Sequence, residues 1–295
     1  MARSTSGESV LTRTMRILGA FSTVSASLSV AEISRHADLP VATAHRLVGE
    51  LVALGALERA PDKRVRVGYR LWEMASRSSP ARDLGRAALP YMEDLQAVVR
   101  EHTQLGVLEG ADVLYLERLS ERDAGRNLAE IAGRLPLHAT SVGLVLLAHG
   151  PPELQERVLS APLRRHTPYT VTDPERLRRV LAAVRRDGYV IAPRTMTEDA
   201  VGVAAPVRDH DDRVVAALSV VVPLRGATAP RAHVPALLAA ARGVSRAMGA
   251  PVRGGDVVHT RGPTRPAPTG AGAEPGPVTP SRPRTGACAA TETSH

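Results

Sequence analysis

Ser29-Val30-Ala31-Glu32-Ile33 and Leu39-Pro40-Val41-Ala42-Thr43-Ala44-His45-Arg46-Leu47-Val48 predict two short helices joined by a tight turn. Ser29 and Glu32 have the spacing of a capping box, in which the serine hydroxyl accepts from the Glu32 amide and the glutamate reaches back. Continuation of this first helix becomes costly before Pro40. A second helix is then expected to run to Gly55, a residue suited to a C-terminal cap.

The second predicted helix has one apolar face. Leu47, Leu51 and Leu54 recur at helical spacing, with Val48 and Val52 beside them, so we expect this face to be buried. Small and polar residues off this face are candidates for contact with DNA, because arginine pairs with guanine or phosphate and the others can approach base edges. These candidates are Ala42, Thr43, His45, Arg46 and Gly49. An ordinary helical hairpin would show the same apolar spacing.

A basic hairpin after the second helix favours a DNA-binding module. Ala60-Pro61-Asp62-Lys63 has the composition of a turn, between a segment at residues 55–58 and an alternating strand at residues 65–69. The basic residues Lys63, Arg64 and Arg66 cluster at this turn, where a wing would meet phosphate. Two helices followed by a basic hairpin predict a winged helix-turn-helix domain.

Several separated motifs resemble a known family. Residues 10–18, 31–33 and 39–47 resemble the amino-terminal domain of IclR-type transcriptional regulators. The segments 134–140, 187–189, 204–209 and 216–219 resemble the effector-binding domain of the same family, so the resemblance covers about residues 9 to 249. Several motifs in the right order are more specific than any one of them.

The expected organisation has three parts. Residues 9–77 would form the winged helix-turn-helix domain, residues 78–249 a linker helix and effector-binding domain, and residues 250–295 a disordered tail in which Pro and Gly make up about a third. The connector is expected to be one helix from about Ala81 to Arg100, with Val98 among its apolar positions. The resemblance implies that this linker helps dimers form.

The second domain is expected to be α+β. A hairpin at residues 103–119, helices beginning near Ser141 and Pro174, strands at 202–207 and 214–222, and a last helix at 234–248 indicate an antiparallel sheet flanked by helices. The resemblance implies a GAF-like domain.

Composition and charge set limits on the class of protein. Residues 1–70 contribute +4 of the net charge of +8, which suits a surface facing phosphates, although all but one of the 38 basic residues are Arg. The single Cys288 cannot form an intramolecular disulfide. The sequence lacks an apolar run of about 18 residues and a signal peptide, so we expect a cytoplasmic protein without a membrane partner.

The search for catalytic chemistry is negative. Asp209-His210-Asp211-Asp212 contains potential metal ligands, but aspartates also favour a solvated hairpin turn, which is the interpretation we adopt. His138 has no obvious nucleophile as a partner and is expected to be a structural or pocket histidine. We therefore predict no catalytic residue, no metal, no cofactor and no enzyme activity.

The resemblance implies a small-molecule effector site. Its residues would be Thr140, Ser141, Val142, Gly143, Ala192, Gly202 and Ser219. A helix amino terminus suits a carboxylate, although Thr140 and Ser141 could simply cap the helix. The family usually has acidic residues soon after the Gly-Tyr pair and often a lysine where this chain has Leu144. This chain has Ala192-Pro193-Arg194-Thr195 after that pair, so we hypothesise an anionic or largely apolar effector.

The function that these features favour is a ligand-responsive, sequence-specific transcriptional regulator. Its partners would be double-stranded operator DNA, a small-molecule effector and other copies of the chain in a homodimer or tetramer. The family resemblance favours a repressor. Two alternatives remain open from the sequence: a metabolite-binding protein with a non-functional DNA module, and an enzyme fused to a DNA-binding domain.

Overall fold

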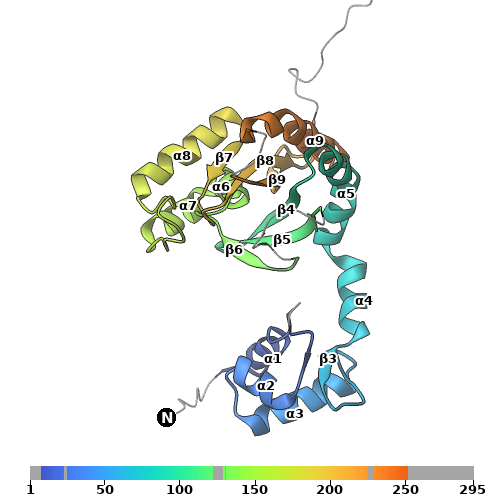
Figure 1. Ribbon diagram of the computed structural model, residues 1–295. Helices are drawn as coiled ribbons and strands as arrows, with labels where there is room; N and C mark the ends of the chain where they lie inside the picture. Colours follow the sequence, from blue (N-terminus) through green and yellow to red (C-terminus); the bar gives the residue numbers. More distant parts are fainter. Residues whose placement is uncertain (1–7, 23–24, 122–128, 130, 225–228, 252–295) are drawn as a thin grey trace, which may run out of the picture. The chain divides into compact units, whose positions relative to one another are not determined.

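The computed structural model describes residues 8–22, 25–121, 129, 131–224 and 229–251. The amino-terminal domain has the order α1 (Val10–Leu18), β1 (Ser27–Leu28), α2 (Val30–His36), α3 (Val41–Ala53), β2 (Leu57–Arg59) and β3 (Val65–Val67) (Figure 1). Its three strands form an antiparallel sheet in the order β1-β3-β2. This arrangement confirms the predicted winged helix-turn-helix fold, to which β1 is an addition.

The predicted capping box starts α2. The Glu32 amide donates to Ser29 Oγ over 3.3 Å, and the Ser29 amide donates to Glu32 Oε2 over 2.7 Å. These hydrogen bonds to Ser29, together with the nearby Arg64 guanidinium, lower the pKa of the Glu32 carboxyl. Gly55 follows α3 with φ +71°, a left-handed conformation that glycine adopts without steric cost.

One aliphatic cluster holds this small domain together. Ile17 of α1, Ile33 of α2 and Leu47 of α3 are almost completely buried against one another and against the sheet. The prediction for Leu54 was wrong: its side chain is 59% exposed, because α3 ends at Ala53 and Leu54 already lies at the cap. The second wing strand is also shorter than predicted, since it ends at Val67 and Tyr69 begins the next helix.

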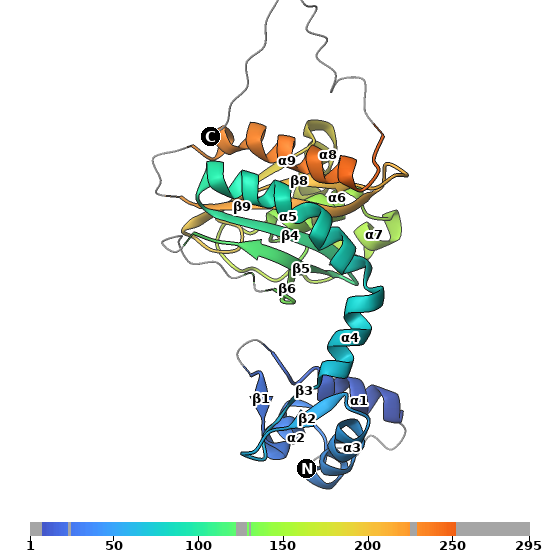
Figure 2. The same ribbon diagram turned by 90° about the vertical axis from the view of Figure 1, so that its right-hand side faces the viewer.

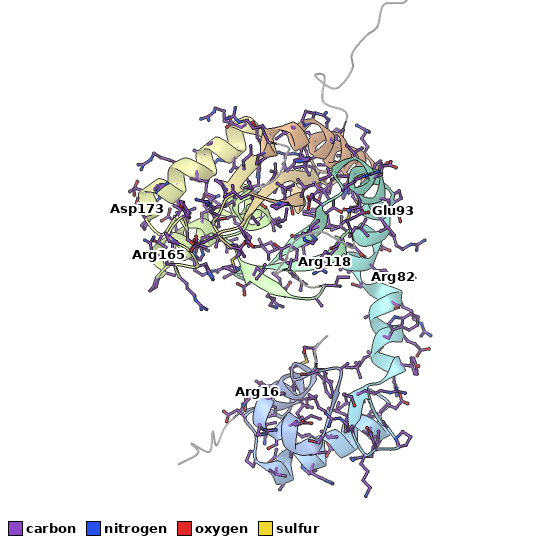
Figure 3. The ribbon with its side chains drawn as sticks, in the orientation of Figure 1. Arg16, Arg82, Glu93, Arg118, Arg165 and Asp173 are labelled. Carbon is purple, nitrogen blue, oxygen red and sulfur yellow. The ribbon has the colours of Figure 1, made fainter. Side chains whose placement is uncertain are left out.

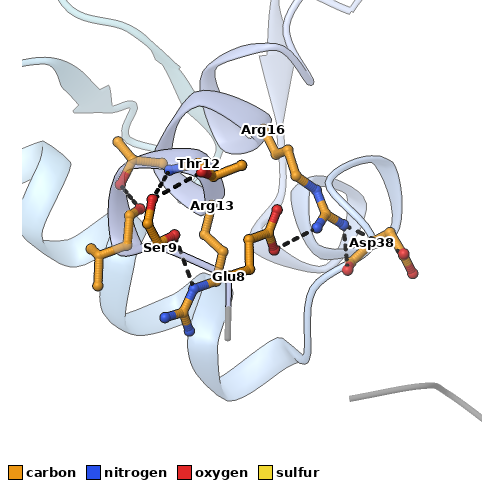
Figure 4. A network of polar contacts seen from close by, with 8 residues as sticks. Glu8, Ser9, Thr12, Arg13, Arg16 and Asp38 are labelled. Atoms are coloured by element: carbon orange, nitrogen blue, oxygen red, sulfur yellow. Dashed lines mark hydrogen bonds and ion pairs between the residues drawn. The ribbon is translucent and has the colours of Figure 1, made fainter. Parts of the chain in front are cut away.

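An arginine fixes α1 to the turn before α3. Arg16 forms an ion pair with Glu8 over 2.8 Å and donates a hydrogen bond to the carbonyl oxygen of Asp38 over 2.7 Å (Figure 4). Asp38 has φ +48°, so this carbonyl belongs to a turn with left-handed backbone. Arg16 thereby stabilises the turn between α2 and α3, the two helices of the helix-turn-helix.

Two helices, rather than the one predicted, connect the domains in sequence. These are α4 (Tyr69–Ser78) and α5 (Pro80–Val99), and α5 continues through Pro90. Leu84, Met92 and Leu95 of α5 pack into a core, as its helical spacing predicts. Val98, which the sequence analysis counted among the apolar positions of this helix, is 71% exposed and lies off the buried face.

The second domain is built on a six-stranded antiparallel sheet in the order β6-β5-β4-β9-β8-β7. Its strands are β4 (His102–Glu109), β5 (Asp112–Leu119), β6 (Arg134–Pro136), β7 (Val190–Pro193), β8 (Ala200–Arg208) and β9 (Val214–Pro223). The helices are α6 (Ser141–His149), α7 (Pro152–Ser160), α8 (Pro174–Asp187) and α9 (Val234–Ala247), with a 3-10 turn at Pro230–His233. The predicted antiparallel α+β fold is confirmed.

The helices cover the two faces of this sheet separately. One aliphatic core lies between the sheet and the adjacent helices α5 and α9, with Leu105 and Leu218 on that face (Figure 2). A second core lies between the opposite face and α6, with Tyr115 and Ala204 on the sheet side. None of the helices assigned to the described residues combines the length and apolar character of a membrane span.

Candidate functional site

The exposed face of α3 carries the residues predicted to contact DNA. His45, Arg46 and Gly49 are exposed, as is Ala42, whereas Thr43 is half-buried. The opposite face contributes Ala44, Leu47, Val48 and Leu51 to the core. The fold therefore presents all five predicted residues on one helix, with most of them accessible to a partner. These accessible positions meet the geometric requirement for a helix that enters a major groove.

Arg46 has an acidic neighbour one helical turn further along. Its guanidinium contacts Glu50 Oε1 over 2.5 Å, and both side chains are more than half exposed. Exposed pairs at this spacing contribute only about 0.3–0.5 kcal/mol. A phosphate or a guanine edge can therefore replace Glu50 as the partner of Arg46 at little cost.

The three basic wing residues differ in their availability. Arg64 donates to the Ser27 carbonyl oxygen over 2.7 Å and contacts Glu32 over 3.0 Å, so it ties the wing to α2. Arg66 forms a cross-strand ion pair with Glu58 over 2.8 Å. Lys63 is exposed at the tip of the wing, with φ +63°, and no ion pair of its ammonium with another described residue is present. Lys63 is therefore the most available cation of the three.

A cavity lies in front of the amino terminus of α6 in the second domain. Its volume is about 60 Å³, and its lining combines sheet residues with the start of α6 and the loop between β7 and β8. The lining residues are Gln104, Tyr115, Ala129, Leu135, Ala139, Thr140, Ser141, Ala192, Thr195, Met196, Thr197, Ala200, Gly202 and Val221. Four of the seven predicted effector residues are in this set.

The start of α6 is capped from within the chain. Thr140 Oγ1 accepts a hydrogen bond from the Gly143 amide over 3.0 Å and donates to the Pro136 carbonyl oxygen over 3.1 Å. Thr140 therefore does cap the helix, as one of the two sequence interpretations stated. A helix offers no carbonyl to its first amides, so those of Ser141 and Val142 are suited to an anion in the cavity.

Two glycines allow α6 to approach its surroundings closely. A Cβ atom at Gly202 of β8 would meet Ser141 Oγ at 2.5 Å, and one at Gly143 would overlap the Leu137 carbonyl oxygen. Gly202 thereby lets Ser141 lie over the sheet and line the cavity. Gly143 and Val142 are buried and do not line the cavity, and the Gly143 amide already donates to Thr140 Oγ1.

Tyr115 and Gln104 are among the cavity residues that the sequence analysis missed. Tyr115 of β5 is buried, and this burial raises the pKa of its phenol, while a hydrogen bond with Thr140 acts in the opposite direction. Gln104 of β4 is 2% exposed, and its Nε2 has no hydrogen-bond partner among the described residues. Gln104 is the last of three consecutive polar residues that begin β4, all of them buried, and nothing in this run distinguishes it.

The loop between β7 and β8 closes one side of the cavity. Thr167 Oγ1 donates to the Arg194 carbonyl oxygen over 2.5 Å, and Thr170 Oγ1 donates to that of Thr195 over 2.7 Å. The Arg194 guanidinium lies 4.8 Å from the Tyr169 ring centroid and donates to its hydroxyl. Arg194 therefore fixes the loop rather than lining the cavity, although the sequence suggested that it could influence the ligand.

Other polar clusters are accounted for by local structure. The ring Nε2 of His138 lies 2.9 Å from the Arg164 carbonyl oxygen, which fits the predicted structural histidine. Its neighbour His166 has a lowered pKa, because burial and the proximity of His138 and Arg164 disfavour the protonated ring. Asp209 Oδ1 accepts hydrogen bonds from the Asp211 and Arg213 amides, as in a hairpin turn. The described residues contain no cluster of three or more metal-ligating side chains.

An arginine of β5 contacts a residue of the cavity wall. Arg118, which is labelled in Figure 3, donates to the carbonyl oxygen of Ala129, itself a lining residue, over 2.7 Å. In the register of β4 with β5, Arg118 is opposite Gln104. Ser219 is also opposite Gln104, on β9, and is fully buried without being a lining residue. Ser219, the last of the predicted effector residues, therefore lies beside the cavity rather than in its wall.

Both domains match models of known protein families. The model of the IclR helix-turn-helix domain matches residues 10–61, and the model for the C-terminal part of bacterial IclR transcriptional regulators matches residues 78–246. The chain is 31% identical over 209 residues to the transcriptional regulator XynR of Escherichia coli, covering 70% of this chain and 83% of that protein. It is 28% identical over 213 residues to the Pca regulon regulatory protein of Pseudomonas putida, covering 71% of this chain and 72% of that protein.

A solved structure is more similar in sequence. An IclR homolog from Microbacterium hydrocarbonoxydans, crystallised in complex with 4-hydroxybenzoate, is 51% identical. The match covers 81% of this chain and 99% of that chain, with a TM-score of 0.77. The chain therefore belongs to the IclR family of bacterial transcriptional regulators, with a helix-turn-helix DNA-binding domain and an effector domain. The relatives named here are regulators.

Proposed function

We propose that this regulator binds operator DNA as a homodimer or a pair of dimers, represses transcription, and responds to a small aromatic carboxylate bound in front of α6. The observation that carries the effector proposal is the cavity itself, which combines first-turn helix amides with walls of both apolar and polar side chains. Ligand sites typically have mostly apolar walls and a few placed polar groups.

The charge of the cavity favours an anion. None of its described lining residues is acidic, and the first-turn amides of Ser141 and Val142 bring the positive end of the α6 dipole. The Ser141 hydroxyl lies beside them over Gly202 and can donate a further hydrogen bond. A carboxylate bound here would complete the hydrogen bonding of the helix terminus.

The apolar part of the cavity wall favours a ring. Leu135, Met196 and Val221 provide apolar contact, and the ring of Tyr115 forms part of the wall. A volume of about 60 Å³ is below the usual range of ligand pockets, so the walls would move apart to admit a ring. The 51% identical homolog was crystallised with 4-hydroxybenzoate, a single ring with a carboxylate, and we take this compound as the first probe.

The operator would be read by α3 and positioned by the wing. Thr43, His45 and Arg46 would reach base edges in the major groove, with Ala42 and Gly49 allowing close approach of the helix. Lys63 would contact phosphate directly, whereas Arg64 and Arg66 would contribute positive charge while remaining paired with acidic residues.

The connector supports self-association. On α4, Tyr69 is 76% exposed and Trp72 is 67% exposed, although aromatic side chains are usually buried in cores or interfaces. We propose that a second copy of the chain covers this helix. Trp72 is the only tryptophan, so its fluorescence emission should shift to longer wavelength when the protein is diluted below its dimer dissociation constant.

Effector control would follow from linkage. A ligand that binds one arrangement of the effector domains more tightly changes the population of arrangements whose recognition helices match the operator. For a repressor, the ligand favours the arrangement with weaker operator binding. The effector and the operator must then each lower the affinity for the other by the same factor.

Calorimetry with matched ligands tests the proposal. We expect 4-hydroxybenzoate to bind and the neutral 4-hydroxybenzamide to bind at least about tenfold more weakly, because a carboxylate makes stronger charge-assisted hydrogen bonds. Binding of neutral polyols or cations, without binding of the acid, would contradict the proposed effector class. In a repression assay, addition of the acid should raise expression of the controlled gene, and a fall would indicate an activator.

A further inference from the structure

A buried amide and a buried hydroxyl face each other beside the cavity without a partner. Gln104 of β4 and Ser219 of β9 are directly opposite in the sheet, with exposures of 2% and 0%. Neither Gln104 Nε2 nor Ser219 Oγ has a hydrogen-bond partner among the described residues. Buried polar groups are nearly always satisfied, so such a pair calls for a missing partner.

The sheet places both side chains on the face that carries the cavity. Residues opposite each other in antiparallel strands share a face, and Ser219 is also opposite Ala204 of β8, which packs in the core under α6. The neighbouring residues Leu105 and Leu218 belong to the core on the other face. Gln104 itself lines the cavity, and its Nε2 is buried there.

Gln104 and Ser219 do not satisfy each other although they are neighbours. Opposite residues have Cβ atoms about 4.5–5.5 Å apart, a separation at which a third small group can bridge two polar side chains. A ligand hydroxyl is suited to Gln104 because it can accept a hydrogen bond from Nε2. Ser219 does not line the cavity and would assist from its place opposite Gln104.

The position of the pair relative to α6 fits the opposite end of a ring. Ser141 lies over Gly202 of β8, and Gly202 is opposite Val221 of β9, which in turn is opposite His102 of β4. Gln104 is two residues beyond His102 on the same strand, so it is two strands away from Gly202, or about 10 Å across the sheet. A ring lying over β9 could therefore place its carboxylate at α6 and another substituent at Gln104.

We propose that Gln104, assisted by Ser219, is a specificity-determining residue that recognises a hydroxyl substituent on the aromatic effector. This inference rests on the proposed function, because it assumes a carboxylate at the start of α6. The start of α6 binds the carboxylate that all aromatic acids share, so it cannot distinguish among acids of similar size. Gln104 would make this distinction. A site built to hydrogen-bond a substituent discriminates strongly against an analogue that lacks it, because its polar groups are then left unpaired.

The test compares two ligands of similar size in two variants. 4-Hydroxybenzoate and 4-methylbenzoate are titrated by calorimetry into the full-length wild type, Gln104→Met and Ser219→Ala. The wild type should prefer the hydroxy acid by at least about tenfold. Gln104→Met should weaken binding of the hydroxy acid by about tenfold while changing the methyl acid less than about threefold. Ser219→Ala should act in the same direction with a smaller loss.

Thermal unfolding without ligand separates this role from a structural one. Because Gln104→Met removes an unpartnered buried donor, its melting temperature should equal or exceed that of the wild type. If Gln104→Met does not fold, the expected melting temperature is wrong. The effect of Ser219→Ala on the preference for the hydroxy acid then decides whether the polar pair recognises the hydroxyl. Equal loss of both acids in the folded variants, or no preference in the wild type, would overturn the inference and leave the proposed function intact. Failure of the wild type to bind either acid would overturn both.

Discussion

The candidate functional residues are exposed and close together in the sequence in one domain, and buried and far apart in the sequence in the other. In the amino-terminal domain, the candidate residues lie on one exposed helix face and a hairpin, within about 25 consecutive residues from Ala42 to Arg66. In the effector domain, the cavity is built from six strands, the start of α6 and a loop, and the residues proposed to bind the ligand, such as Gln104 and Ser141, are buried. An exposed surface can be altered with little effect on stability, whereas a change in the cavity also changes the core. The following experiments use this difference.

The largest expected effect is on operator binding. Replacing Thr43, His45 and Arg46 together with alanine should reduce affinity for the selected operator by about 100-fold or more, since each base contact contributes about 1–3 kcal/mol. Fluorescence anisotropy with labelled DNA measures this loss. The control Arg246→Ala removes an equal charge from an exposed site on α9 and should leave sequence preference unchanged. Retained preference in the triple variant would place the recognition surface elsewhere.

Gly143→Ala should give the next largest effect. Its new Cβ would overlap the Leu137 backbone and approach Thr140 Oγ1 at 2.6 Å, so the start of α6 must move. Overpacking of this kind costs about 1–3 kcal/mol. Chemical denaturation should show a less stable effector domain, and calorimetry should show weaker binding of 4-hydroxybenzoate. A variant with wild-type stability and affinity would contradict the tight packing at this helix start.

Gly49→Ala is the matched substitution in the other domain. No atom lies within 4 Å of a Cβ built at Gly49, which is on the exposed face of α3. Alanine should therefore stabilise the domain by about 0.5–1 kcal/mol through its higher helix propensity. Denaturation measures this gain, and a loss of stability would contradict the open surroundings. A more stable variant with weaker operator binding would indicate that DNA approaches α3 at this residue.

The smallest expected effect concerns pH. The folded domain lowers the pKa of His166 below its ordinary value of 6.5, so the unfolded chain binds protons more readily. The stabilising contribution of neutral His166 is present above pH 6.5 and is lost as the pH falls through the lowered folded pKa. Melting temperatures measured from pH 7.5 to 5 should therefore fall less steeply for His166→Gln than for the wild type. An identical slope would exclude this linkage.

The sequence predicted more of the amino-terminal domain than of the effector domain, because contacts between nearby residues leave a pattern in the sequence and contacts between distant segments do not. Ser29 and Glu32 lie three residues apart, so their capping box and the helix that follows were visible in the sequence. Gln104 and Ser219 are separated by more than a hundred residues and meet only through the pairing of β4 with β9. The family resemblance supplied Ser219 but not Gln104. The short strands β6 and β7 and the helix α4 were missed, because three or four residues carry little periodicity and none of the α4 residues whose exposure is described is buried.

Control of DNA binding by an aromatic carboxylate is the central claim, and one titration tests it most directly. An operator fragment is selected from genomic DNA by the purified protein, and its affinity is measured by anisotropy with increasing 4-hydroxybenzoate, at fixed salt because phosphate contacts make affinity salt-dependent. We expect saturable weakening of at least about fivefold, typical of allosteric coupling, with 4-hydroxybenzamide having little effect. Unchanged operator affinity at ligand concentrations that saturate the cavity by calorimetry would contradict the claim.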